Sequence, residues 1–208
     1  NLEYEHRIGD SQQMNGIKLV KHGALSVREM AFCGLFTALI ATGAFIQINI
    51  PVQPFPMHFT LQFFFVLLAG FLLGPRLGTL SVCIYLAVGL VGVPIFAAGG
   101  GPAYLVRPTF GFLLGFAFAC YVTGSIARLS QRTTVRWYLF SAFWGMIVMY
   151  LSGMFYFYFI SNFVIHMPVT WKLVFINCFL LTVGGDFILC VMAAVLARRL
   201  KPIVRMFD

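Results

Sequence analysis

Long apolar segments, separated by short polar or proline- and glycine-rich stretches, make up most of this chain from residue 28 onward. A helix needs about 20 mainly apolar residues to cross a hydrocarbon core that is about 30 Å thick. Several of these segments reach or approach that length, and the pattern predicts six membrane-spanning helices. The expected spans are residues 28–50, 59–73, 77–93, 110–127 and 137–163, and a last span that follows Lys172 and ends near Leu196.

Proline and glycine mark the ends of the predicted helices. Pro51, Pro54 and Pro56 follow the first span and predict an irregular loop, because proline lacks a backbone donor and interrupts a helix. Gly74-Pro75-Arg76 predicts a tight turn after the second span, and a glycine-rich loop is expected at residues 94–108. The predicted fold class is therefore an all-α integral membrane protein.

Composition and charge support this interpretation and predict an orientation. Of the residues, 61% are hydrophobic and 10% are charged, whereas soluble domains carry about 25% charged residues. Basic residues collect on cytoplasmic flanks of membrane proteins, so the net charge of +8 indicates topology and not nucleic-acid binding. With both termini cytoplasmic, twelve of the fourteen Lys and Arg residues lie inside, and only Arg107 and Lys172 lie outside. The twelve are Arg7, Lys18, Lys21, Arg28, Arg76, Arg128, Arg132, Arg136, Arg198, Arg199, Lys201 and Arg205.

The chain divides into two parts on the same pattern. Residues 1–25 are polar and mixed in charge, and we expect a tail that lies at the membrane surface. Residues 26–208 are expected to form one six-helix membrane domain, with no room for a separate soluble domain.

Asp186 is the acidic residue that lies in the interior of a predicted span, about midway along the sixth, whereas Glu29 lies at the cytoplasmic end of the first. A carboxylate there is costly unless it is paired, neutralised or facing water, so it is a functional-site hypothesis by default. The structural alternative is a protonated Asp that is hydrogen-bonded to a neighbouring helix. Gly184-Gly185 precedes it and Thr182 lies one turn earlier on the same face.

Four further polar residues are candidates for binding a ligand near the outer side. Arg107 lies where the glycine-rich loop enters the fourth span, and a guanidinium there can hold a carboxylate through two hydrogen bonds or reach lipid headgroups. Tyr104 could cover a ligand or be an interfacial aromatic residue. Gln62 and Asn162, near the outer ends of the second and fifth spans, could contact a polar ligand or cap a helix.

Small residues repeat along the first span. Gly34, Ala38 and Thr42 are spaced by four, and Ala31 flanks them, so a neighbouring helix could approach closely. The stripe alone is compatible with packing inside this protein and with packing against a partner.

Signatures of enzymes are absent from the sequence. There is no H-E-x-x-H, no G-x-S-x-G and no nucleotide-binding G-x-x-x-x-G-K-[ST]. We expect no metal, no cofactor and no catalytic residue. A membrane-embedded enzyme that uses Asp186 as a general base is the alternative from another class.

Several short sequence motifs resemble those of the BioY family. They lie in order between about Met30 and Leu200, and the stretch from Pro56 to Phe116 is the most specific. The motifs are Pro56-Met57-His58-Phe59-Thr60-Leu61-Gln62, Leu67-Leu68-Ala69-Gly70, Leu73-Gly74-Pro75-Arg76-Leu77-Gly78, Gly92-Val93-Pro94-Ile95-Phe96, Arg107-Pro108-Thr109-Phe110-Gly111-Phe112-Leu113-Leu114-Gly115-Phe116 and Gly185-Asp186.

The resemblance implies a biotin-binding S component of an energy-coupling-factor (ECF) transporter, in the cell (inner or plasma) membrane of a prokaryote. Such subunits have six helices and bind biotin from outside. A transmembrane coupling protein, the T component, and two ABC-type ATPases supply energy, although some members occur without dedicated partners. The resemblance also implies that Ala31, Gly34 and Ala38 contact the coupling protein. The same fold could serve another vitamin or act only as a scaffold.

Three features depart from the usual pattern of this family, and in one of them Gly184 replaces the Pro that precedes Gly-Asp. Leu189 stands where many members carry Lys, and the loop Gly99–Gly101 lacks the Arg that many members have there. Biotin has two ureido N–H donors, an apolar bicycle and a carboxylate tail. We therefore expect Asp186 to accept from the ureido group, aromatic side chains to enclose the bicycle, and Arg107 to bind the tail.

Overall fold

The computed structural model describes residues 25–51, 56–130 and 134–205. The chain forms two compact units, Asn1–Ala31 and Phe32–Asp208, and their boundary falls within helix α2 (Val27–Phe45). Almost all of the expected polar tail, residues 1–25, lies outside the described residues. Ser26 and Glu29 form a reciprocal cap at the start of α2, since the backbone N–H of each donates to the other's side chain, at 2.8 and 3.2 Å.

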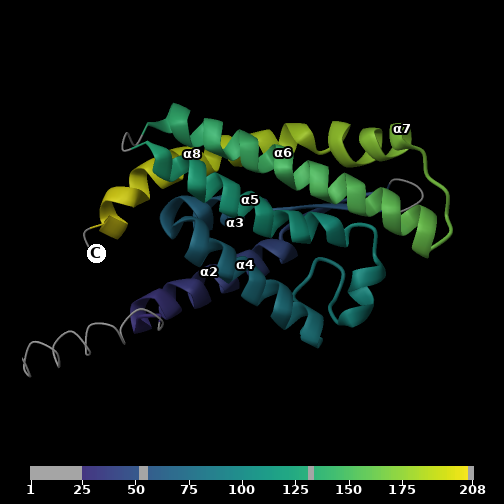
Figure 1. Cartoon of the computed structure of the whole chain (residues 1–208), viewed down its shortest axis with the longest axis horizontal. Coiled ribbons are helices and arrows are strands. Elements are labelled where there is room, and N and C mark those ends of the chain that lie inside the picture. The colour runs from purple at the N-terminus through teal and green to yellow at the C-terminus, as the bar shows by residue number, and fades with distance from the viewer. Residues whose placement is uncertain (1–24, 52–55, 131–133, 206–208) are drawn as a thin grey trace, which may run out of the picture. The chain divides into compact units, whose positions relative to one another are not determined.

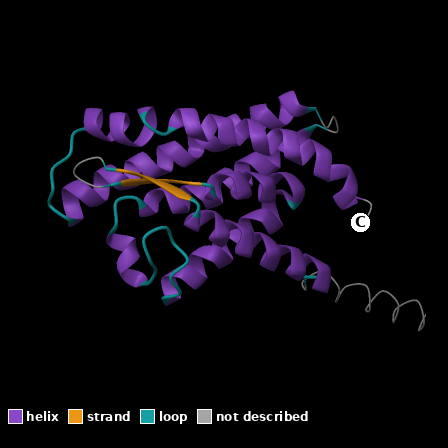
Figure 2. Cartoon of the chain, turned by 180° about the vertical axis from the view of Figure 1, so that it is seen from behind, coloured by secondary structure: helices purple, strands orange, loops and turns teal. Residues whose placement is uncertain are grey.

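The second unit is built mainly from helices. Helices α5, α6 and α8 run side by side in both views, and the packing of α5 on α6 and of α6 on α8 agrees with this (Figures 1 and 2). The elements after α2 are β1 (Gln47–Ile50), β2 (Met57–Thr60), α3 (Gln62–Leu72), α4 (Gly74–Val91), η1 (Pro102–Val106), α5 (Phe110–Leu129), α6 (Val135–Phe159), η2 (Ile160–Val164), α7 (Trp171–Val174), η3 (Phe175–Leu180) and α8 (Val183–Arg205).

Helix α3 is the central element of this unit. It packs against α4, α5 and α8, and almost all of its residues are buried. A helix that is apolar on all sides is typical of such a position. The close packing depends on glycine: a Cβ on Gly124 of α5 would lie 2.9 Å from the carbonyl oxygen of Gly70 on α3. Gly74, with φ +83°, makes the predicted tight turn between α3 and α4.

The prediction of an all-α fold is wrong between the first two spans. The first helix ends at Phe45 and not near Ile50, and the second begins at Gln62 and not at Phe59. Residues 47–50 and 57–60 form an antiparallel hairpin, orange in Figure 2, that pairs Gln47 with Thr60. Alternating polar and apolar residues suit a strand. The prolines prevent this segment from continuing as a helix, and pairing of the two strands satisfies its backbone N–H and C=O groups instead.

The last two predicted spans contain changes of helical pitch. The π-helix η2 extends α6 beyond Phe159, and the π-helix η3 with a turn at Leu181–Thr182 separates α7 from α8. π-helical segments are rare and occur frequently at functional sites. The final helix continues to Arg205, so the basic residues predicted to close the chain lie on it.

Five helices among the described residues are long and apolar enough to cross a membrane: Val27–Phe45, Gly74–Val91, Phe110–Leu129, Val135–Val164 and Trp171–Pro202. The remaining predicted span, the second at residues 59–73, corresponds to α3, which has 11 residues and is therefore about 16 Å long. An apolar stretch of that length is typical of a buried core or re-entrant helix, in agreement with the burial of α3.

The small residues predicted to form a contact stripe behave in two ways. Gly34, Ala38 and Thr42 are exposed, and a Cβ on Gly34 would meet no atom within 4 Å. Ala31 belongs to the first unit and is also exposed. In contrast, Gly111 of α5 faces the side chain of Tyr156 on α6 and serves packing within the protein.

Candidate functional site

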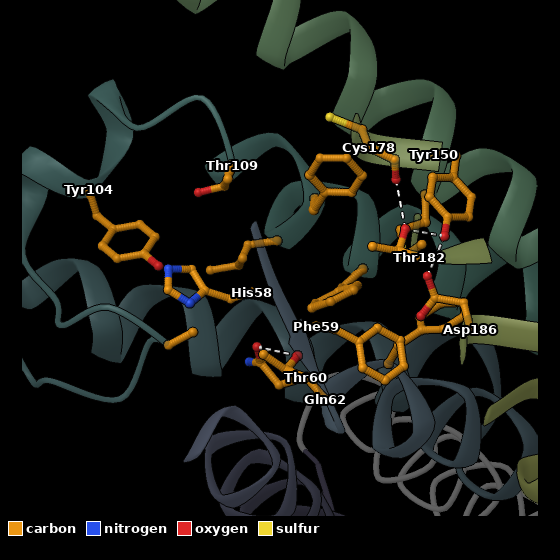
Figure 3. Close-up of a pocket in the computed structure, with 16 residues that line it drawn as sticks. His58, Phe59, Thr60, Gln62, Tyr104, Thr109, Tyr150, Cys178, Thr182 and Asp186 are labelled. Atoms are coloured by element: carbon orange, nitrogen blue, oxygen red, sulfur yellow. Dashed lines mark hydrogen bonds between the residues drawn. The ribbon is translucent and has the colours of Figure 1, made fainter. Parts of the chain in front are cut away.

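A pocket in the second unit brings together side chains from distant parts of the chain (Figure 3). The empty space between these side chains, including the open mouth, is about 630 Å³. Its walls come from β2, α3, the loop after α4, η1, α5, α6, η3 and α8. The lining residues are His58, Phe59, Thr60, Gln62, Phe63, Ala97, Tyr104, Thr109, Phe112, Leu113, Phe116, Met149, Tyr150, Cys178, Thr182 and Asp186.

Asp186 forms one polar end of the pocket. It is 6% exposed, and the Tyr150 hydroxyl donates a hydrogen bond to its Oδ2. The same hydroxyl lies 2.8 Å from Thr182 Oγ1, which in turn lies 2.7 Å from the carbonyl oxygen of Cys178. Figure 3 shows this chain of contacts at the opposite side of the pocket from Tyr104.

Local backbone structure presents the Asp186 end. Cys178, Thr182 and Asp186 are spaced by four residues and share one face of the last helical stretch. The backbone N–H of Asp186 donates to the carbonyl of Thr182 at 3.0 Å, so the first turn of α8 carries the carboxylate. A Cβ on Gly185 would lie 2.5 Å from the Phe59 ring, which explains how β2 approaches this helix so closely.

His58, Tyr104 and Arg107 form the second polar group. His58 Nδ1 lies 2.6 Å from Oδ1 of its cross-strand partner Asn49. Partial burial, and after it the positive charge of Arg107, lowers the pKa of His58 from its usual 6.5. Burial raises the pKa of Tyr104 from its usual 10.0, and the charge of Arg107 opposes this shift. The pocket is therefore in the field of Arg107 at this end, and His58 is mainly neutral at pH 7.

Arg107 lies beside the pocket wall and not in it. It is exposed at the end of η1, with its guanidinium carbon 5.1 Å from the centre of the Tyr104 ring. The ring of Tyr104 packs against that of Phe96 in the glycine-rich loop, with the ring centres 4.7 Å apart. The Tyr156 hydroxyl of α6 donates to the carbonyl of Leu105 at 2.6 Å and ties η1 to the helices. A cation is thus held at the pocket rim on a firm support.

Gln62 contributes a polar side chain that is already engaged. It is buried, its Nε2 donates to the Tyr85 hydroxyl at 2.6 Å, and its Oε1 accepts from Thr60 at 3.2 Å. Tyr85 continues the network by donating to the carbonyl of Ile95 at 3.2 Å. Gln62 therefore links β2, α3 and the glycine-rich loop beneath the pocket.

Aromatic and aliphatic side chains line the space between the two polar groups. Phe63 and Phe116 stack with ring centres 5.9 Å apart, and Phe112 meets Tyr150 edge-on at 6.2 Å. Phe59 lies near Asp186 in Figure 3. An apolar wall with polar groups at both ends suits an amphipathic small molecule.

The structure brings together three of the five predicted binding residues. Asp186, Tyr104 and Gln62 line one pocket, and Arg107 lies at its rim. Asn162 does not line it: its side chain donates to the carbonyl of Val169 at 3.2 Å and accepts from the N–H of Val169 at 3.1 Å. These bonds tie η2 to Val169, the residue before the N-cap of α7, so Asn162 braces this turn of the backbone.

His58 and Tyr150 are two of the pocket residues that were not among the predicted set. The sequence indicated no binding role for His58, but β2 carries it to the pocket. Tyr150 is one of many aromatic residues in α6, and its partner Asp186 lies 36 positions away in sequence. The alternation of polar and apolar residues around Asn49 and His58 could have indicated a hairpin and so the position of His58. The sequence holds no comparable signal for Tyr150.

Within the described parts of the chain, no three His, Cys, Asp or Glu side chains are grouped so that they could hold a metal ion. The pocket chemistry consists of hydrogen bonding, charge at the rim and apolar contact.

Fold and pocket together define a multi-pass membrane protein with a pocket lined by several of its helices. The model of the BioY family matches residues 14–206, and the chain belongs to this family. It is 39% identical to the probable biotin transporter BioY of Lysinibacillus sphaericus over 180 residues, which cover 86% of this chain and 90% of that protein. It is 39% identical to the biotin transporter BioY of Thermotoga maritima over 178 residues, covering 85% and 98%.

A solved structure has the same fold. It is the crystal structure of the S-component for biotin from an ECF-type ABC transporter. The TM-score is 0.73 and the sequence identity is 26%, with 86% of this chain and 95% of that chain covered. The names of these relatives describe transporters and not enzymes.

Proposed function

We propose that this protein is the membrane-embedded biotin-binding subunit, the S component, of an ECF-type transporter and serves biotin uptake. The observation that carries the proposal is the pocket, in which Asp186 and a rim cation lie at opposite ends of an apolar wall. Membership of the BioY family and the names of its relatives support biotin as the molecule bound.

The chemistry of biotin matches the two ends of the pocket. Asp186 presents acceptor oxygens for the ureido N–H groups, and the rings of Phe112 and Phe116 can enclose the bicycle. At the other end Arg107 supplies the charge that a carboxylate needs when it leaves water. Backbone N–H groups of the glycine-rich loop are a weaker alternative, because those of Gly99 and Gly101 already donate within the loop region.

The remaining polar candidates have supporting roles in this proposal. Tyr104 covers the carboxylate end and orients Arg107 through the ring contact. The Gln62 amide already bonds Tyr85, so Gln62 has limited capacity left for the ligand. His58 adds a ring nitrogen at the Tyr104 end of the pocket. Asn162 holds the turn after η2 and does not contact biotin.

We propose that the chain crosses the plasma membrane of a prokaryote six times, with α3 as the short second span and both termini cytoplasmic. The distribution of Lys and Arg supports this orientation. Residues 26–208 then form the membrane domain, and residues 1–25 form a tail at the cytoplasmic surface.

The proposed partners are a T component and two ABC-type ATPases. The exposed small residues Gly34 and Ala38 of α2 offer a surface on which a partner helix can approach closely. Ala31, an exposed small residue of the first unit, is also proposed as a partner contact. Energy for uptake comes from the ATPases, because this chain has no nucleotide-binding sequence of its own.

A binding titration tests the proposal directly. The full chain, purified in detergent, is titrated with biotin, and with thiamine and riboflavin as vitamins of different shape. We expect saturable 1:1 binding of biotin only, and a strong loss in Asp186→Ala. A folded protein that does not bind biotin, or that binds another of these vitamins better, would overturn the proposal.

A further inference from the structure

We propose that Tyr150 is a positioning residue that orients the Asp186 carboxylate for its ligand. Its hydroxyl occupies Oδ2 and leaves Oδ1 for the N–H groups of the bound molecule. The inference rests on the proposed function of the pocket and adds a residue from a different helix, α6.

The Tyr150 side chain is held firmly in its place. It is 2% exposed, and its ring meets Phe112 edge-on at 6.2 Å and Phe179 edge-on at 5.0 Å. Rings on two sides leave the hydroxyl directed at Asp186 and Thr182, as Figure 3 shows. A fixed donor of this kind selects one orientation of the carboxylate and lowers the entropy cost of ordering it on binding.

Few other groups near Asp186 can stabilise its carboxylate, so the hydrogen bond from Tyr150 is important. Among the residues that line the pocket, none is Lys or Arg, and the titratable groups near Asp186 are Tyr150, Cys178 and Cys190. One turn further along α8, Leu189 is 5% exposed and offers no donor. A buried carboxylate needs hydrogen bonds or a counter-charge. Of the described contacts of Asp186, the one from Tyr150 supplies a side-chain donor.

Thr182 extends the arrangement by one step. Its hydroxyl has one proton, which it gives either to the carbonyl of Cys178 or to the Tyr150 oxygen. In the second case the chain Thr182 to Tyr150 to Asp186 is aligned, and each bond polarises the next. Removal of the Thr182 hydroxyl should therefore act in the same direction as removal of the Tyr150 hydroxyl, but more weakly.

A double-mutant cycle tests whether Tyr150 acts through Asp186. Biotin affinity is measured by calorimetry for the wild type, Tyr150→Phe, Asp186→Ala and the double variant. We expect Tyr150→Phe to weaken biotin about 10-fold in the wild-type background, since a hydrogen bond to a charged group has about this effect. In the Asp186→Ala background the same change should alter affinity less than twofold.

Ligand analogues add a readout that a purely structural role would not change. Tyr150→Phe should weaken biotin and its neutral tail amide by the same factor, because the hydroxyl acts at the ureido end. The same substitution should reduce the affinity less for an analogue that is methylated on one ureido nitrogen. Tyr158→Phe is the matched control on the same helix: Tyr158 stacks on Trp171 at 4.2 Å, does not line the pocket, and should leave affinity unchanged.

The outcomes separate the two proposals. If the losses of biotin affinity are additive, so that Tyr150→Phe has its full effect also in the Asp186→Ala background, the positioning role is overturned. Biotin binding by the wild type, and with it the proposed function, would still stand. A wild type that does not bind biotin overturns the proposed function itself. If Tyr150→Phe does not fold, the same cycle with Thr182→Val decides, and additivity there contradicts the proposal.

Discussion

Replacing Arg107 by Ala tests how the carboxylate end of the ligand is held. The guanidinium is exposed at the pocket rim, over the ring of Tyr104. Exposed ion pairs contribute about 0.2–1 kcal/mol, and hydrogen bonds to charged groups about 1.5–3 kcal/mol. A rim position lies between these cases, so we take about 1 kcal/mol. Since about 1.4 kcal/mol corresponds to tenfold, Arg107→Ala should weaken biotin about fivefold.

The assay compares biotin with its uncharged amide on the same purified protein. The amide lacks the carboxylate charge, so Arg107→Ala should change its affinity less than twofold. Arg107→Lys keeps the charge and should recover part of the loss, and Arg136→Ala, an exposed Arg in the first turn of α6, should change neither ligand. Salt near 1 M should narrow the difference between biotin and amide, because it screens exposed charges. Equal factors for biotin and amide in Arg107→Ala would refute the assignment.

Three further predictions address pH, the partner surface and packing. His58 is mainly neutral at pH 6.5 and gains a proton only below its lowered pKa, so the affinity for biotin relative to that for its amide should rise as the pH falls below 6.5; calorimetry with His58→Gln should show a constant ratio, and an unchanged slope contradicts the role. Gly34→Leu should impair uptake by cells and leave biotin binding intact, and equal loss of both would place Gly34 inside the fold. Gly124→Ala places a Cβ 2.7 Å from the backbone nitrogen of Pro75 and should destabilise the protein by about 1–3 kcal/mol; thermal unfolding in detergent measures this, Gly34→Ala is the control, and equal midpoints would contradict the packing argument.

The helical framework was predictable from the sequence, because apolar length and the placement of proline and glycine are local signals. The turn at Gly74 was predicted for the same reason. The hairpin was missed because Gln47 to Ile50 directly follow a long apolar segment, and a period of two over four residues is hidden beside a helix. Its partner strand lies beyond three prolines, and pairing between strands is a tertiary event.

The site was predictable to the extent that single residues are conspicuous. Asp186 stands out because a carboxylate in an apolar segment is costly wherever the fold places it. Tyr150 does not stand out, since a Tyr among many aromatic residues acquires its role only from the neighbour it meets. His58 depends on the hairpin that was missed, and Asn162 was assigned to binding because sequence does not distinguish a contact with loop backbone from a ligand contact.

The burial of α3 has a consequence for how the protein is made. The ribosome releases α3 early, but one of the helices that cover it is α8, which follows all the other described helices. Until then, lipid or the insertion machinery must shield the uncovered side of a helix that is too short to span the bilayer alone, and the turn at Gly74 favours its entry as a pair with α4. Since α8 also carries Asp186, its arrival covers α3 and supplies the pocket carboxylate in the same step.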